Sequence, residues 1–386
     1  MYTTLNELKN LFQQQFGEES LLVEAPGRIN LIGEHTDYNE GFVLPAAIDK
    51  SVKFIIQPSG TSQCSIIAND LDEEYSFSLD EALKPVALHW VNYFLGVIDE
   101  LKSKNHVVKG FNLLFSSDIP IGSGLSSSAA IECGFGYALN QLFDLGLSRV
   151  EIALIGQKAE HKFAGVKCGI MDQFASILGK EGHVMQLDCR TLEYTYFPAN
   201  FADYQLVLFD TQVKHNLADS EYNIRRNQCE KGLDAIKSVN KTATSLRDVS
   251  LAELFQVQDE MDQKIVDRCK YIIEENERVH EVCNALKTKN IEKVGQLMFD
   301  THHGLSTLYE VSCHELDLLI DLVKHQKDVV GARMMGGGFG GCTLNLIKKS
   351  GVDEVVEKIK SNYYEHTGID LKVYQVAVSD GVKTIS

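Results

Sequence analysis

The sequence is short of positive charge. It has 386 residues, of which 37 are lysine or arginine and 54 are aspartate or glutamate, so the formal net charge is −17. A surface this negative repels nucleic acids and anionic lipids, and we therefore expect neither a nucleic-acid partner nor a membrane partner. An anionic substrate is compatible with this charge only where a local cationic patch or a metal ion offsets it.

The sequence also lacks long hydrophobic runs, a secretory leader and paired cysteines. No apolar stretch is long enough to span a bilayer. The first residues, MYTTLNELKNLFQQQFG, have an amphipathic helix pattern without the basic region of a signal peptide. The nine cysteines are scattered, odd in number and contain no CxxC pair, which argues against a disulfide framework and a zinc site. We therefore predict a cytoplasmic protein.

No internal repeat, low-complexity segment or proline-rich linker divides the chain. A chain of 386 residues is nevertheless long for one hydrophobic core, so two domains are expected. Strand and helix patterns alternate in the first half, helical patterns dominate from Ser220 to about Tyr309, and the tail alternates again. These patterns predict an α/β or α+β fold with two domains, residues 1–195 and 196–386.

The residues give a more detailed set of elements. Strands are expected at 21–26, 29–34, 43–48, 52–58, 64–70, 74–79, 112–117, 182–198, 204–213, 343–349 and 372–379. Helices are expected at 89–105, 124–144, 148–165, 314–326 and 352–368. Small residues in the helix at 124–144 indicate close packing against a neighbour. Residues 331–342 are interpreted as a glycine-rich segment.

One loop, DIPIGSGLSSSAAIE at 118–132, has the position and composition of a phosphate-binding loop but contains no lysine or arginine. It matches neither GxxxxGK[ST] nor GxGxxG. Its glycines permit close approach to an anion, and the helix that follows offers free N–H groups and a positive dipole end. A serine in the first turn can also bind Mg²⁺, which would supply the missing charge. The alternative is a glycine-serine helix start that binds nothing.

A second segment, APGRINLIGEHTDYNEGF at 25–42, gathers Arg28, Glu34, His35 and Asp37 after an apolar run. Carboxylates this close together suit a polyhydroxylated ligand, because each accepts two hydrogen bonds from neighbouring hydroxyls. The alternative is a solvated turn with an Arg–Glu pair. We favour the binding site, because a solvated turn does not need an arginine before a buried strand.

Three further features are open to two interpretations. Asp172, in GVKCGIMDQFAS, would by itself be a helix cap more often than a catalyst. The five glycines of GGGFGGC at 336–342 indicate that the backbone passes close to another group, either a phosphate or the first loop. For the pair His302–His303, packing or a surface position is favoured over a metal site.

Together these stretches resemble the galactokinase subgroup of the GHMP kinase family. GRINLIGEHTDY is similar to the subgroup's signature, PIGSGLSSSAA to the family's ATP-binding motif and GGGFGG to its third motif. CGIMDQ, AEHKFAG and EYNIRRNQC add further matches. The resemblance covers nearly the whole chain, and no motif is broken or missing.

The resemblance implies a two-domain fold with the active site in the cleft between the domains. It implies transfer of the γ-phosphoryl group of ATP to the anomeric hydroxyl of α-D-galactose, with Asp172 as catalytic base and Arg28 stabilising the transition state. It implies sugar-binding roles for Glu34, His35, Thr36, Asp37, Gly169 and Tyr222. It implies that the nucleotide phosphates lie against Gly122, Ser123, Gly124, Leu125, Ser126, Ser127 and Ser128, and that Ser128 and Glu160 hold Mg²⁺.

Other functions remain open at this point. A related sugar kinase would act on N-acetylgalactosamine or arabinose, and a galactose sensor would bind the same ligands without catalysis. A nucleotide-binding structural module would leave residues 28–37 without a purpose. The adenine pocket is not given by the motifs: Trp90 and Tyr93 would form an aromatic wall there, or belong to the core. We expect small-molecule partners only, galactose and ATP, and a monomer.

Overall fold

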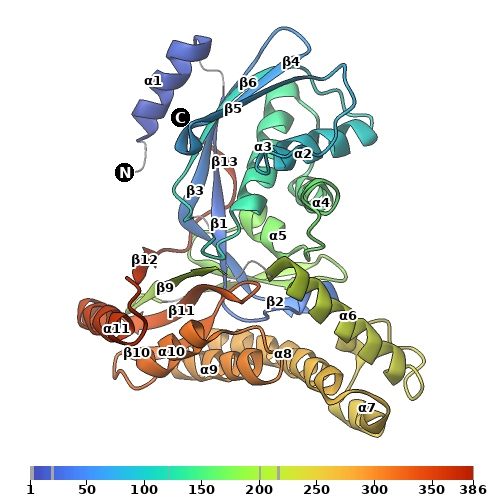
Figure 1. Ribbon diagram of the computed structural model, residues 1–386, viewed down its shortest axis with the longest axis vertical. Coiled ribbons are helices and arrows are strands. Elements are labelled where there is room, and N and C mark those ends of the chain that lie inside the picture. The colour runs from blue at the N-terminus through green and yellow to red at the C-terminus, as the bar shows by residue number, and fades with distance from the viewer. Residues whose placement is uncertain (1–3, 19–20, 121, 200, 215–217, 386) are drawn as a thin grey trace.

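The computed structural model describes residues 4–18, 21–120, 122–199, 201–214 and 218–385. Its N-terminal part is built on a six-stranded sheet, and its C-terminal part on a four-stranded sheet with a group of helices beneath it (Figure 1). The larger sheet has the strand order β13 (Lys383–Thr384), β1 (Leu21–Asn30), β3 (Pro45–Pro58), β6 (Phe111–Ser117), β4 (Gln63–Ala68) and β5 (Glu73–Ser78).

Strand β1 carries the first four residues of GRINLIGEHTDY, among them Arg28. It pairs antiparallel with β3, and the register shifts between Pro26 and Arg28. The strands predicted at 21–26 and 29–34 form one strand that ends at Asn30. The prediction at 29–34 was wrong beyond that residue: Leu31 and Ile32 are buried, but their backbone leaves the sheet. Strand β3 likewise joins residues 45–48 of one predicted strand to the strand predicted at 52–58, while Val43 lies in the short strand β2 (Phe42–Val43).

Helices cover both faces of the larger sheet. One face carries α2 (Val91–Ser103), α3 (Ser127–Phe143), α4 (Arg149–Ala159), a π-helical turn η3 (Glu160–Ala164) and α5 (Met171–Leu178) (Figure 1). Helix α1 (Leu5–Phe16) packs Leu8 and Phe12 on the other face. The close packing expected of α3 is confirmed at Gly134, where an added Cβ would lie 2.4 Å from the Phe54 ring and 2.5 Å from the Ala25 Cβ.

The smaller sheets and the remaining helices complete the fold. The four-stranded sheet has the order β10 (Val329–Met334), β11 (Gly340–Lys348), β9 (Tyr204–Lys214) and β12 (Lys372–Val376), and a third sheet the order β2 (Phe42–Val43), β7 (His183–Asp188) and β8 (Tyr194–Pro198). The helices are α6 (Ala218–Ile236), α7 (Leu251–Gln256), α8 (Gln263–Lys287), α9 (Ile291–Thr307), α10 (His314–Val323) and α11 (Val352–Thr367). Short turns are η1 (Asp37–Asn39), η2 (Asn69–Leu71), η4 (Leu246–Asp248), η5 (Gln258–Glu260) and η6 (Lys349–Gly351).

The mixed fold is confirmed, and its described strand pairs are antiparallel apart from β4 with β6. The division near residue 195 stays a prediction. Residue 195 lies within β8, and the last strand, β13, returns to pair with β1 (Figure 1). Within the described ranges, no helix combines the length and the apolar character needed to cross a membrane. The nine cysteines are free thiols.

Candidate active site

Two glycine-rich loops meet at the centre of the molecule. A Cβ added at Gly124 would lie 3.3 Å from the Met335 carbonyl oxygen, and one added at Gly336 would lie 3.5 Å from the Gly124 Cα. Both glycines have positive φ, 76° and 83°, a conformation that favours glycine. The expectation that the backbone of 336–342 passes close to the first loop is confirmed.

Arg28 and Asp172 form a bidentate ion pair beside this contact. Arg28 Nε donates to Asp172 Oδ1 at 2.8 Å, and Nη2 donates to Oδ2 at 2.9 Å. Arg28 Nη1 also donates to the Gly124 carbonyl oxygen, and the Ser126 hydroxyl donates to Asp172 Oδ2. Asp172 is the second residue of α5, whose N-cap residue is Ile170. Its carboxylate is thus engaged by side chains from β1 and the first loop, and it does not act as the N-cap.

Glu34 is held in a second buried ion pair. Its carboxylate accepts hydrogen bonds from Arg333 Nη2, from Asn30 Nδ2 at 2.9 Å and from the Gly336 N–H at 2.9 Å. Burial acts to raise the pKa of Glu34, but Arg333 and Arg28 outweigh it and the pKa is lowered. The solvated turn considered for this segment is wrong, because Glu34 and Arg28 are buried and have different partners.

His35 and Asp37 face the same cavity. His35 has φ 64°, and its Nδ1 lies 2.8 Å from the Tyr38 hydroxyl, while its buried Nε2 has no hydrogen-bond partner among the described residues. Burial lowers the pKa of His35 to about 4. Burial, and after it the nearby Asp172, raises the pKa of Asp37 to about 7. A Cβ added at Gly169 would lie 1.9 Å from Asp37 Oδ2, so only glycine fits there.

The cavity has a volume of about 150 Å³ and is lined from both halves of the chain. Its lining residues are Arg28, Glu34, His35, Asp37, Glu160, Val166, Cys168, Gly169, Met171, Asp172, Tyr222, Gly336 and Gly337. The Tyr222 ring, from α6, lies 5.4 Å from the His35 ring, centroid to centroid. Residues 144 positions apart in sequence, Arg28 and Asp172, are in direct contact here.

Thr36 differs from its neighbours. Its hydroxyl donates to the carbonyl oxygens of Gly33, at 2.9 Å, and Phe42, at 2.6 Å, and it is not among the cavity's lining residues. Thr36 therefore closes the turn that presents its neighbours. The hydroxyl of Thr36 thus has a structural role, and the expected part of Thr36 in sugar binding stays a prediction.

The first loop has several distinct roles. Gly122 and Gly124 have positive φ, and α3 begins at Ser127, so Ser127 and Ser128 occupy its first turn. Leu125 is buried and its carbonyl oxygen accepts the Arg28 N–H. The Ser123 hydroxyl donates to the Pro120 carbonyl oxygen. Together with Ser126, which donates to Asp172, these contacts use two of the predicted phosphate-binding hydroxyls within the protein.

The Mg²⁺ expected here fits the residues present. Burial, and then Asp172, raises the pKa of Glu160 to about 7, which marks a carboxylate short of positive charge. Ser128 is among the neighbours that act to lower the pKa of Glu160, so the two predicted ligands lie near one another. No group of three or more His, Cys, Asp or Glu side chains suited to a metal occurs in the part of the chain that is described. Mg²⁺ commonly takes one or two protein oxygens and completes its octahedron with phosphate and water, which suits this pair.

Trp90 belongs to the core around α2. Its ring lies 5.9 Å from that of Phe94 and 5.6 Å from that of Phe115, and its Nε1 donates to Glu73. The Tyr93 ring lies 5.7 Å from that of His89. These contacts support core packing for Trp90, the alternative to an adenine wall.

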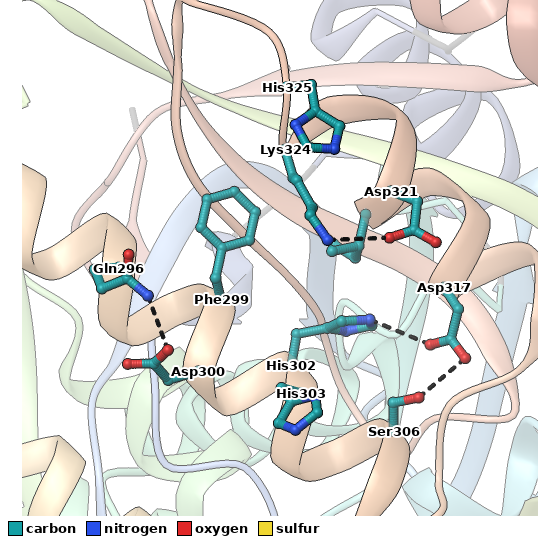
Figure 2. A pocket seen from close by; sticks show the side chains of 11 residues that line it. Gln296, Phe299, Asp300, His302, His303, Ser306, Asp317, Asp321, Lys324 and His325 are labelled. Carbon is teal, nitrogen blue, oxygen red and sulfur yellow. Dashed lines mark hydrogen bonds and ion pairs between the residues drawn. The ribbon is translucent and has the colours of Figure 1, made fainter.

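The side chains of the adjacent residues His302 and His303 point in different directions (Figure 2). His302 is buried, accepts the Met334 N–H at Nδ1 and lies 3.2 Å from Asp317 through Nε2, whereas His303 is exposed. Both line a cavity of about 630 Å³ between α9 and α10. His302 thus joins α9 to the end of β10, two residues before Gly336.

Sequence reasoning missed several residues of the site. Arg333, which neutralises Glu34, lies in the stretch interpreted only as glycine-rich. Cys168 and Gln173 donate to Glu160. The only sequence feature that could have indicated them is the CGIMDQ motif, of which they are the first and last residues. Buried Glu132 accepts from Gln173, and burial raises its pKa well above the usual range. No local pattern indicated Glu132, because it lies within a helix of ordinary apolar character.

Comparison with known proteins agrees with this geometry. Family models match at three places: the galactokinase galactose-binding signature at residues 10–58, the GHMP kinases N terminal domain at 92–180 and the GHMP kinases C terminal domain at 284–365. The fold is thus that of a GHMP kinase.

Similar proteins indicate which subgroup of the GHMP kinases the chain belongs to. The galactokinase of Thermosipho africanus is 42% identical over 364 residues, which is 94% of this chain and 99% of the relative. That of Clostridium acetobutylicum is 40% identical over 384 residues, 98% of each chain. A crystal structure of Lactococcus lactis galactokinase complexed with galactose is 34% identical, with a TM-score of 0.95, covering 99% of this chain and all of the other. The chain belongs to the galactokinase family.

Proposed function

We propose that this protein transfers the γ-phosphoryl group of ATP to the anomeric hydroxyl of α-D-galactose, giving galactose 1-phosphate and ADP. The observation that carries the proposal is the Arg28–Asp172 pair, which faces a small cavity together with Asp37 and adjoins the lysine-free phosphate loop. This arrangement supplies a proton acceptor, sugar ligands and a nucleotide site in one place.

The residues at the cavity and the first loop have different roles in the proposed reaction. Asp172 accepts the proton of the anomeric hydroxyl while the oxygen of that hydroxyl attacks the γ-phosphorus and ADP leaves. Arg28 fixes the orientation of Asp172 and offsets negative charge on the transferring group. Asp37, His35 and Glu34 orient the sugar, so that positioning supplies much of the rate. Ser128 and Glu160 would hold Mg²⁺, which would supply the positive charge that a loop lysine would otherwise give to the phosphates.

A coupled assay of ATP turnover with and without galactose tests the proposal. ADP formation that requires galactose supports it. A protein that binds galactose without ADP formation would be a sensor, and turnover without any sugar would contradict a sugar kinase. A panel containing N-acetylgalactosamine and arabinose separates the related sugar kinases.

Catalysis is expected to require Mg²⁺, and to require more of it when Ser128→Ala and Glu160→Gln are combined. Each substitution removes one oxygen ligand from a cation that demands near-octahedral geometry. The measurement is the Mg²⁺ concentration for half-maximal rate. An unchanged value in the double variant would show that other residues hold the metal.

Galactose affinity is expected to fall below pH 7. Sugar hydroxyls donate to an ionised carboxylate, so binding favours loss of the Asp37 proton, whose pKa in the free protein is about 7. Below that pH the dissociation constant should rise by up to about tenfold per pH unit. Isothermal titration on both sides of pH 7 measures it. Asp37→Asn should abolish the slope, whereas Glu160→Gln should keep it.

The remaining expectations keep their sequence basis. The cytoplasmic location is proposed from the cysteine distribution, and the two domains divided near residue 195 from the chain length and the strand pattern. The monomeric state stays a proposal. Sedimentation velocity tests the oligomeric state.

A further inference from the structure

Three helices converge behind the proposed metal site. Glu132 lies on α3 and Gln173 on α5, and Glu160 begins the π-helical turn after α4. Gln173 Nε2 donates to Glu132 Oε2 at 3.2 Å and to Glu160 Oε2 at 3.0 Å. Since one nitrogen serves both carboxyl groups, the Gln173 amide joins α3 and α5 to the π-helical turn after α4.

The hydrogen bonds select one oxygen of Glu160. Gln173 Nε2 and the Cys168 thiol, at 3.3 Å, both donate to Oε2. Neither reaches Oε1, which is therefore the oxygen left for a cation. Carboxylates that bind metals are commonly fixed in this way by outer hydrogen bonds, which set the orientation of the ligating oxygen.

Burial of Glu132 and Gln173 costs free energy, and close packing alone does not explain why these polar residues are here. Glu132 and Gln173 are both 0% exposed, and Glu132 Oε1 and Gln173 Oε1 have no hydrogen-bond partner among the described residues. Leaving buried polar atoms unpaired costs about 1–3 kcal/mol each. Leucine or methionine would fill the same space without that cost.

The neighbouring helix leaves room for both side chains. Gly156 on α4 faces them: a Cβ there would lie 3.2 Å from the Glu132 Cβ and 3.3 Å from the Gln173 Cγ. Both distances are tighter than ordinary contact, so a larger residue would displace the pair. The sequence of α4 thus permits this arrangement.

We propose that Glu132 and Gln173 are a positioning pair for Glu160: Glu132 fixes the Gln173 carboxamide, which turns Glu160 so that Oε1 faces the magnesium ion. This inference rests on the proposed function, because it requires Glu160 to be a metal ligand. Neither residue lines the cavity that contains Asp37 and Asp172, so the pair acts on that cavity only through Glu160, which does line it.

The test is Mn²⁺ affinity in the presence of ADP, measured by electron paramagnetic resonance. Gln173→Met keeps the length of the side chain and removes its amide. Loss of an outer-sphere partner should weaken metal binding by about 10–100-fold. Galactose affinity by isothermal titration should change much less than Mn²⁺ affinity, because neither Glu132 nor Gln173 lines the cavity. Wild-type Mn²⁺ affinity in Gln173→Met would overturn the proposal.

Two further comparisons keep the test decisive. Glu132→Gln retains an acceptor for the Gln173 amide and should bind Mn²⁺ almost as wild type, whereas Glu132→Met should resemble Gln173→Met. Equal affinities of the two Glu132 variants would overturn the proposal even if Gln173→Met fails to fold. Cys133→Ala is the control, because the Cys133 thiol donates to the backbone carbonyl oxygen of Gln173 and not to its side-chain amide.

Glu160→Gln separates this inference from the proposed function. If it leaves Mn²⁺ affinity unchanged, the assignment of Glu160 as a metal ligand fails, and the positioning pair fails with it. If it weakens binding while Gln173→Met does not, only the pair fails.

Discussion

Asp172→Asn is expected to lower turnover by about 10²–10⁴-fold, the usual effect of removing a positioned general base. Asparagine keeps the size of the side chain and one oxygen for Arg28, but it cannot accept the proton of the sugar hydroxyl. Its amide nitrogen would also face a guanidinium N–H or the Ser126 hydroxyl, which both donate to Asp172. The measurements are kcat in the coupled assay and folding by circular dichroism.

The control is Asp188→Asn. Asp188 also accepts two hydrogen bonds from one arginine, Arg247, but it does not line the sugar cavity. Both variants lose a carboxylate from a bidentate pair, so both lose some stability. Only Asp172→Asn should lose catalysis. Near-normal turnover in this variant would return Asp172 to a structural role at the start of α5.

Asp37→Ala is expected to narrow the preference for galactose over glucose. By resemblance, Asp37 accepts hydrogen bonds from the C3 and C4 hydroxyls, and glucose differs from galactose only in the direction of the C4 hydroxyl. A buried carboxylate that loses a partner costs about 1–3 kcal/mol. Sites built around a hydroxyl reject analogues without it by roughly 10⁴-fold or more. Wild type should therefore use glucose very poorly in kcat/KM.

The variant should lose much more activity on galactose than on glucose. Asp37 is neither the base nor a metal ligand, so the glucose activity that wild type has should largely survive. Glu40→Ala is the control, since Glu40 lies at the end of the same turn and pairs with Arg190 at the surface. Equal proportional losses on both sugars would mean that Asp37 supports the fold, and that galactose preference arises elsewhere.

Local sequence patterns predicted most of the helices and strands. The helix expected at 89–105 is α2 at Val91–Ser103, because its apolar residues recur at helical spacing. Strand β10, at Val329–Met334, was missed. Its glycine and arginine resemble loop composition, and its strand conformation depends on pairing with β11 and on burial. Such tertiary contacts leave no short-range pattern.

The site was predictable as separate segments but not as a set of contacts. The segment 28–37 was readable because its charged residues are neighbours in sequence. The Arg333–Glu34 pair joins residues 299 positions apart, and the sequence instead offered Arg28 as the nearby partner. Asp172 was recognised through the family resemblance, since residue type and local pattern alone favoured a helix cap.

The contact between Gly124 and Gly336 links the proposed nucleotide site to the proposed sugar site. The Gly124 carbonyl oxygen accepts from Arg28, and the Gly336 N–H donates to Glu34 in the sugar segment. A displacement of either loop at this contact would therefore change a hydrogen bond in the other proposed site. Thermodynamic linkage then demands reciprocity: the factor by which ATP changes galactose affinity equals the factor by which galactose changes ATP affinity. Substitutions that separate the two loops would reduce this factor while leaving every substrate-contacting side chain in place.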